Sequence, residues 1–77
     1  MTKTEFRNSA IYKKYMERIK GYSKGYNFTI PYYKMTRPQI NAINVILNDA
    51  AKAKIIDSMS FGINLEGEMT EATYIRL

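Results

Sequence analysis

The segment from Met35 to Ile40 is the strongest constraint on the fold, because it combines several signals for the start of a helix. Thr36 is a favoured N-cap residue, and Gln39 three positions later completes a capping box, with Met35 and Ile40 as a hydrophobic staple. Pro38 falls in the first turn, where its missing N–H costs nothing. Apolar side chains then recur at helical spacing, at Ile40, Ile43, Ile46, Leu47 and Ala50. The sequence therefore predicts one unbroken helix over about residues 37–53.

The same start signal occurs at the beginning of the chain. Thr2 is the expected N-cap, Glu5 closes the capping box, and Met1 against Phe6 forms the staple. A helix predicted over about residues 3–20 turns four apolar or aromatic side chains inward, namely Tyr12, Tyr15, Met16 and Ile19. One narrow stripe elsewhere on its surface is cationic and consists of Lys3, Arg7, Lys14 and Arg18. Gly21 suits the position after the helix end.

Three further segments predict strands. Residues 26–33 are rich in aromatic and β-branched residues, and Pro31 restricts this strand to a sheet edge. The clearest strand follows the second helix, with Met59, Phe61, Ile63 and Leu65 alternating with Ser58, Ser60, Gly62, Asn64 and Glu66. Such alternation predicts one buried face and one wet face. Residues 66–68 then turn the chain, and residues 72–77 return as the last strand.

These elements predict an α+β fold in the order α-β-α-β-β, formed by one compact domain over residues 1–77. We expect a small antiparallel sheet of about three strands, with both helices packed on one face. A winged helix is the named alternative, since it also ends in a hairpin. It requires a helix-turn-helix between its first two strands, where this sequence predicts a single helix.

Positive charge and aromatic rings are concentrated in the first half of the chain. Residues 1–37 hold nine Lys and Arg against two Glu (+7), whereas residues 38–77 hold three against five acidic residues (−2), which together give the net charge of +5. Six of the seven tyrosines also lie in the first half. A basic, aromatic pole favours an acidic or polyanionic partner. The candidate binding residues are Arg7, Lys14, Arg18, Tyr22, Lys24, Tyr26, Tyr32, Tyr33, Lys34 and Arg37.

Enzyme chemistry is disfavoured because the chain has no His and no Cys. The most common general base, the thiol nucleophile and the usual zinc ligands are therefore missing. Glu66, Glu68 and Glu71 lack the spacing of a calcium loop and are interpreted as a solvated turn. Asp57 has two interpretations, a buried acid or a wet residue where its strand begins. We expect no catalytic residue, no metal site and no cofactor.

Composition also predicts a location. The absence of Cys favours a reducing, cytoplasmic setting, and charged residues close to the N-terminus do not form a secretion signal. The longest aliphatic run, residues 45–47, is too short to cross a bilayer. We therefore expect a cytoplasmic protein with no membrane partner.

In size, in richness of Lys, Tyr, Asn and Ile, and in lacking Cys and His, the chain resembles accessory proteins of phages and mobile elements from AT-rich Gram-positive bacteria. The resemblance covers general character and no motif. It implies stoichiometric inhibition of host machinery, as by anti-CRISPR and other anti-defence inhibitors. The basic charge departs from inhibitors that imitate DNA with an acidic surface.

The resulting hypothesis is a non-enzymatic inhibitor or regulator that occludes a host nucleic-acid-handling complex, for example a CRISPR nuclease, through its basic Tyr-rich face. Its partner would be an acidic protein surface or a nucleoprotein complex of the host. The alternative is a small DNA- or RNA-binding protein that uses the same face. A homodimer is a further option, because edge strands offer docking edges.

Overall fold

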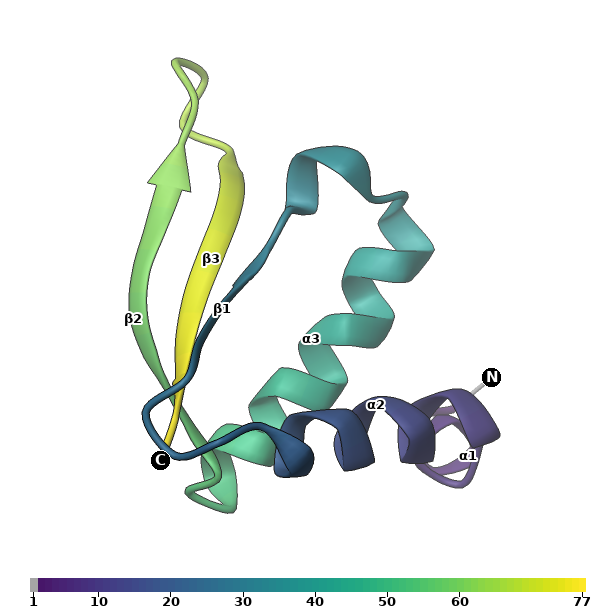
Figure 1. Cartoon of the computed structure of the whole chain (residues 1–77). Helices are drawn as coiled ribbons and strands as arrows, with labels where there is room; N and C mark the ends of the chain where they lie inside the picture. Colours follow the sequence, from purple (N-terminus) through teal and green to yellow (C-terminus); the bar gives the residue numbers. More distant parts are fainter. Residues whose placement is uncertain (1) are drawn as a thin grey trace.

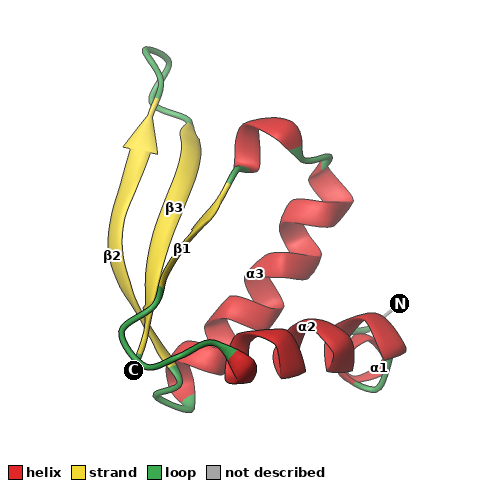
Figure 2. Cartoon of the chain, in the orientation of Figure 1, coloured by secondary structure: helices red, strands yellow, loops and turns green. Residues whose placement is uncertain are grey.

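The sheet and helices of this protein form the predicted α+β fold (Figures 1 and 2). The structure, a computed structural model, describes residues 2–77. The elements in chain order are α1 (Lys3–Arg7), α2 (Ala10–Gly21), β1 (Asn27–Ile30), the single 3-10 turn η1 (Tyr32–Lys34), α3 (Arg37–Lys52), β2 (Ile56–Ile63) and β3 (Met69–Arg76). The helices α2 and α3 lie on the same side of the sheet (Figure 2).

The sheet is antiparallel with strand order β1-β3-β2, so β3 is central and the other two strands are edges. Phe28 of β1 lies opposite Tyr74 of β3, and their rings stack with centroids 5.8 Å apart on the side that faces the helices. Along the other edge of β3, where β2 pairs with it, Phe61 of β2 lies opposite Ala72. A register shift between Ser58 and Ser60 makes a bulge in β2.

The predicted helix over residues 37–53 is confirmed as α3. Thr36 Oγ1 accepts a hydrogen bond from the Gln39 amide (3.4 Å), and the Thr36 amide donates to Gln39 Oε1 (2.9 Å), so the capping box is complete. The buried side chains of α3 are Ile43, Ile46, Leu47 and Ala50. They join Ile19, Tyr32, Ile56 and Ala72 in the core.

The capping box makes a direct prediction about stability. Thr36→Ala removes the side-chain oxygen that accepts from the Gln39 amide, and it should lower the free energy of unfolding by about 1 kcal/mol. Urea denaturation followed by circular dichroism measures the change. Thr36→Ser retains the oxygen and should cost less than half as much. Equal losses in the two variants would show that the cap contributes nothing.

The first helix is not continuous, and this prediction was wrong in detail. Asn8 ends α1, and Ser9 begins α2 by accepting a hydrogen bond from the Tyr12 amide (3.3 Å). Asn and Ser side chains compete for backbone hydrogen bonds, so they favour helix ends over helix interiors. The predicted capping box of Thr2 and Glu5 is present, whereas the staple from Met1 lies outside the described residues.

The strand predicted over residues 26–33 is shorter than expected. It ends at Ile30, because Pro31 cannot donate to the sheet and the chain turns into η1. The last strand begins at Met69 rather than at residue 72. Between β1 and β2 the described chain contains η1 and one helix, as the single-helix prediction required, and not two helices joined by a turn.

The predicted buried face of β2 is mostly exposed. Met59, Phe61, Ile63 and Leu65 are 51%, 59%, 57% and 104% exposed, and only Ile56 at the start of the strand is buried. The bulge between Ser58 and Ser60 makes Met59 the extra residue and breaks its alternation with Ile56, and the tip of the hairpin extends past the helices (Figure 1). Asp57 is exposed and its carboxylate accepts from the Ser58 amide, which agrees with the wet interpretation.

Candidate binding groove

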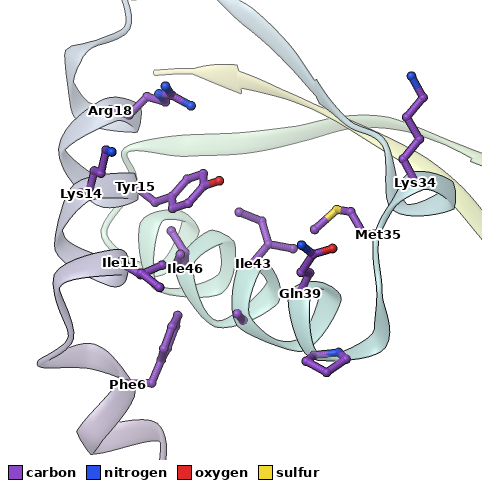
Figure 3. Close-up of a pocket in the computed structure, with 12 residues that line it drawn as sticks. Phe6, Ile11, Lys14, Tyr15, Arg18, Lys34, Met35, Gln39, Ile43 and Ile46 are labelled. Carbon is purple, nitrogen blue, oxygen red and sulfur yellow. The ribbon is translucent and has the colours of Figure 1, made fainter.

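A groove opens between α2 and α3, with α1 near one end and η1 near the other (Figure 3). It has a volume of about 770 Å³. Its lining comes from both helices of the N-terminal half and from the first half of α3. The hydrogen bond from the Tyr12 hydroxyl of α2 to Asp49 of α3 (2.7 Å) joins the two helices, and the groove lies over the part of α3 from Pro38 to Ile46.

The floor and walls of the groove are apolar. Ala42, Ile43 and Ile46 contribute from α3, and Met35 and Pro38 contribute where that helix begins. The opposite wall is formed by Phe6, Ile11 and Tyr15 (Figure 3). Ile46 is 1% exposed and belongs to the core, whereas Ile11 is 62% exposed. The groove thus leads from exposed apolar side chains on one helix down to the core.

Three cations stand around this apolar surface. Lys14 and Arg18 are one turn apart on α2, and Lys34 approaches from η1 (Figure 3). The Arg18 guanidinium carbon lies 5.8 Å from the centroid of the Tyr15 ring, and Lys34 Nζ lies 5.6 Å from the centroid of the Tyr33 ring. Among the residues that the structure describes, none of the three cations forms an ion pair. The positive charge at the rim is therefore not neutralised by an ion pair within residues 2–77.

A polar cluster fixes the helices that form the groove. The Asp49 carboxylate of α3 accepts hydrogen bonds from Arg7 Nε (2.8 Å) and Nη2 (3.0 Å) and from the Tyr12 hydroxyl (2.7 Å). The hydrogen bond from Arg7 holds the pKa of Asp49 below its ordinary value, and Asp49 in turn raises the pKa of Arg7. Burial, and then the bond to Asp49, raises the pKa of Tyr12. This cluster ties α1 and α2 to α3.

Three of the ten sequence-predicted binding residues, Lys14, Arg18 and Lys34, meet at the groove. Two others have structural roles. Arg7 does not extend the cationic stripe of the helix, because the helix breaks after it and its guanidinium binds Asp49. Tyr32 is 7% exposed and donates to Asn44 Oδ1 (2.9 Å), and burial together with the neighbouring Tyr74 raises its pKa to about 12. Tyr32 is thus part of the core and does not present its ring to a partner.

The remaining predicted residues lie outside the groove. Tyr22 is half-buried between Tyr26 and Phe28, with ring centroids 4.7 and 5.1 Å away, so its ring packs against β1. Tyr26 and Tyr33 are 50% and 63% exposed, and Lys24 and Arg37 are exposed as well. The ten residues therefore divide among a groove, the core and separate surface positions.

Sequence reasoning missed Tyr15 as a groove residue, because helical periodicity assigned it to the core. It is 41% exposed. Ile11 was missed as well, although an Ile one turn before Tyr15 and beside the predicted inner face is the signal that could have found it. Gln39 and Ala42 could not be found, since no pattern in the sequence shows how far apart two packed helices stand.

Within residues 2–77 no three acidic side chains come close enough to hold a metal ion. Over the same residues, no helix has both the length and the apolar character needed to span a bilayer. No known protein family matches the chain, and no curated protein or solved structure shows significant similarity to it.

Proposed function

We propose that this chain is a non-enzymatic binding protein whose groove accepts an acidic, partly apolar segment of another protein. The observation that carries the proposal is the combination of an apolar floor with three cations that lack ion-pair partners in residues 2–77. Apolar side chains of the partner would fill the floor, and its carboxylates would reach Lys14, Arg18 and Lys34. Arginine and aromatic side chains, such as Arg18 and Tyr15, are enriched at the centres of protein interfaces.

The dimensions of the groove agree with an amphipathic helix as the bound segment. A volume of about 770 Å³ accommodates several side chains from one helix face. Helices bound in grooves place apolar anchors at positions i, i+3, i+4 and i+7. The cations lie at the rim on both sides of the floor, so acidic residues flanking the apolar anchors would meet them.

A protein segment is favoured over DNA or RNA by two observations. Arg18 and Lys34 each lie beside an exposed tyrosine ring, but the floor of the groove is aliphatic and offers no ring on which a base could stack. The hairpin carries Asp57, Glu66, Glu68 and Glu71 and has no Lys or Arg from residue 55 to residue 75, so it would repel a phosphate backbone.

In the setting that the resemblance implies, the partner is an acidic surface of a host nucleic-acid-handling complex. Binding would then act by steric occlusion, because a segment held in the groove of this chain is no longer open to the partner's other ligands. This role requires only that the groove bind more tightly than the partner's natural ligand at the same surface.

A model peptide tests the groove directly. We expect a fluorescently labelled peptide of about 15 residues, with Leu on one helical face and Glu on its flanks, to bind with micromolar affinity in an anisotropy titration. Lys14→Glu and Arg18→Glu should each weaken binding about tenfold, because each replaces attraction with repulsion. Amide chemical shifts should change along the groove, at Ala42 and Ile43 above all.

The matched control is Lys13→Glu, which makes the same charge change one residue away on an exposed position outside the groove. It should weaken peptide binding about twofold or less. Labelled single- and double-stranded oligonucleotides form the second arm, over roughly 50 to 500 mM salt. Tight, steeply salt-dependent oligonucleotide binding without peptide binding would refute the proposal in favour of a nucleic-acid partner. Equal effects of Lys13→Glu and Lys14→Glu would remove the groove from the mechanism.

A further inference from the structure

We propose that a second, smaller hollow beside the groove binds one phenylalanine ring of the partner segment, and that Arg18 pairs with a carboxylate that flanks this ring. This preference rests on the proposed function, since it specifies which acidic, partly apolar segments bind. The hollow, which we call the ring pocket, lies where α2, β1 and α3 come together. It shares Tyr15, Arg18 and Ile43 with the groove, so the two hollows adjoin at these residues (Figure 3).

The floor of the ring pocket belongs to the hydrophobic core. Ile19, Ile43 and Leu47 are all buried and contribute the floor from α2 and α3. Phe28 and Ile30 add a half-buried wall from β1. Side chains that border an open hollow lack packing partners on that side, so an apolar guest restores their dispersion contacts and itself leaves water. The ring pocket therefore favours an apolar occupant.

The size of the ring pocket and the rings in its lining select phenylalanine. Its volume is about 190 Å³, and a cavity of about 150 Å³ lined by Leu, Ile and Phe is enough to hold benzene. Tyr22 and Phe28 line it with ring centroids 5.1 Å apart, and Tyr15 contributes a third ring. A guest phenyl ring gains edge or offset contacts with these rings in addition to its apolar burial.

Polar rings fit this hollow less well. A tyrosine hydroxyl directed at Ile19 and Leu47 would lose its hydrogen bonds to water without replacement, and the hydrogen-bonding edge of a nucleobase would lose more. The aliphatic floor thus discriminates between kinds of ring, and it favours a phenylalanine side chain over a tyrosine or a base.

Arg18 supplies the charge that identifies the occupant as part of an acidic segment. It stands at the junction of the groove and the ring pocket, and its guanidinium carbon lies 5.8 Å from the centroid of the Tyr15 ring. Within the described residues 2–77 it forms no ion pair. A carboxylate beside the bound ring would accept two parallel N–H bonds from its guanidinium. The unit that the chain recognises is therefore a Phe flanked by Glu or Asp.

A peptide series measures the preference for Phe. In the labelled peptide with Leu on one face and Glu on its flanks, each Leu in turn is replaced by Phe, Tyr or Ala. At one position, Phe should bind about three- to tenfold more tightly than Leu, and about tenfold more tightly than Tyr and Ala. If Phe exceeded Leu and Tyr at no position while the Leu peptide still bound, the ring pocket would be overturned and the proposed function would stand.

Hydrocinnamate, a phenyl ring joined to a carboxylate by two methylene groups, tests the ring pocket without a helix. It should bind with millimolar affinity in an NMR titration. Its ring should shift the methyl signals of Ile19, Ile30 and Leu47, which line only the ring pocket. The methyl signals of Ile11, which lines only the groove, should shift less.

The uncharged hydrocinnamamide tests the contribution of Arg18. It should bind about threefold more weakly than the acid. Arg18→Gln should abolish this difference, whereas the control Lys13→Gln, outside both hollows, should retain it. Both side chains are exposed, so circular dichroism should show an unchanged fold. Equal binding of acid and amide to the natural chain would overturn the pairing of Arg18 with a carboxylate.

The pattern of shifts separates the competing occupants. Methyl shifts confined to Ile11 and Ile46 would place the ring in the groove and overturn the ring pocket. Larger shifts at Ile19 and Leu47 with adenosine or uridine monophosphate than with hydrocinnamate would assign the hollow to a nucleobase and overturn it as well. Hydrocinnamate in the ring pocket, with no binding of the Leu or Phe peptides, would support the ring pocket and contradict the proposed function of the groove.

Discussion

Replacing Ile46 with alanine should destabilise this protein more than any other single truncation in α3. Ile46 is 1% exposed and is one of the largest fully buried side chains in the core. Truncating a buried Ile to Ala costs about 2 to 5 kcal/mol, because apolar burial is lost and a cavity remains. A domain of this size has a stability of only about 5 to 10 kcal/mol. Urea denaturation should therefore show a loss of about a fifth or more of the free energy of unfolding.

Ile11→Ala is the matched control for this prediction. It makes the same chemical change in another groove-lining Ile, which is 62% exposed. Its cost should stay within about 0.5 kcal/mol. The comparison separates the stability contributed by a buried residue of the groove floor from that contributed by an exposed residue of its wall. Similar costs for the two variants would contradict the burial of Ile46 in the core between α3 and the sheet.

The elements that local chemistry controls were predictable from the sequence. The capping box at Thr36 and Gln39 and the apolar spacing after it specify α3 from neighbouring residues alone. The break between α1 and α2 was readable too, since Asn8 and Ser9 favour helix ends, but the helical periodicity of the flanking residues masked it. Local signals therefore give the order of the elements and only approximate ends.

Exposure in β2 was not predictable, because alternation does not reveal whether another element covers the apolar face. Met59, Phe61 and Ile63 follow the pattern of a half-buried strand, yet α3 packs near Ile56 and leaves them open. The protein core is set by how far the helices reach along the sheet, which is a property of the whole chain.

The candidate site was predictable in its chemistry and not in its geometry. Composition identified a basic, aromatic half, and Lys14, Arg18 and Lys34 do gather at one groove. Arg7 was separated from them by a carboxylate 42 residues away, and no local pattern shows that pairing. Long-range ion pairs of this kind decide which cations remain available to a partner.

The pairing of Arg7 with Asp49 predicts a specific dependence of stability on pH. The pKa of Asp49 in the folded state lies below its ordinary value of 3.8, since Arg7 and Tyr12 donate to the charged form. The cluster therefore stabilises the fold fully above about pH 4, and the stabilisation disappears as the pH falls through the folded-state pKa. Asp49→Asn should lower the free energy of unfolding by about 1 to 2 kcal/mol at pH 7. Solvent screening of Arg7, whose side chain is 43% exposed, favours the lower end of that range.

The decisive measurement is the free energy of unfolding of both chains between about pH 7 and pH 2.5. The difference between the natural chain and Asp49→Asn should be constant down to about pH 4 and then shrink, because protonated Asp49 and the asparagine that replaces it both present a neutral group to Arg7. Asp57→Asn is the control, since that exposed carboxylate accepts only from the adjacent Ser58 amide and joins no two elements. A difference that stays constant to the lowest pH would show that the Asp49 charge does not hold α1 and α2 against α3. The groove would then depend on apolar packing alone, and its width should be insensitive to acid.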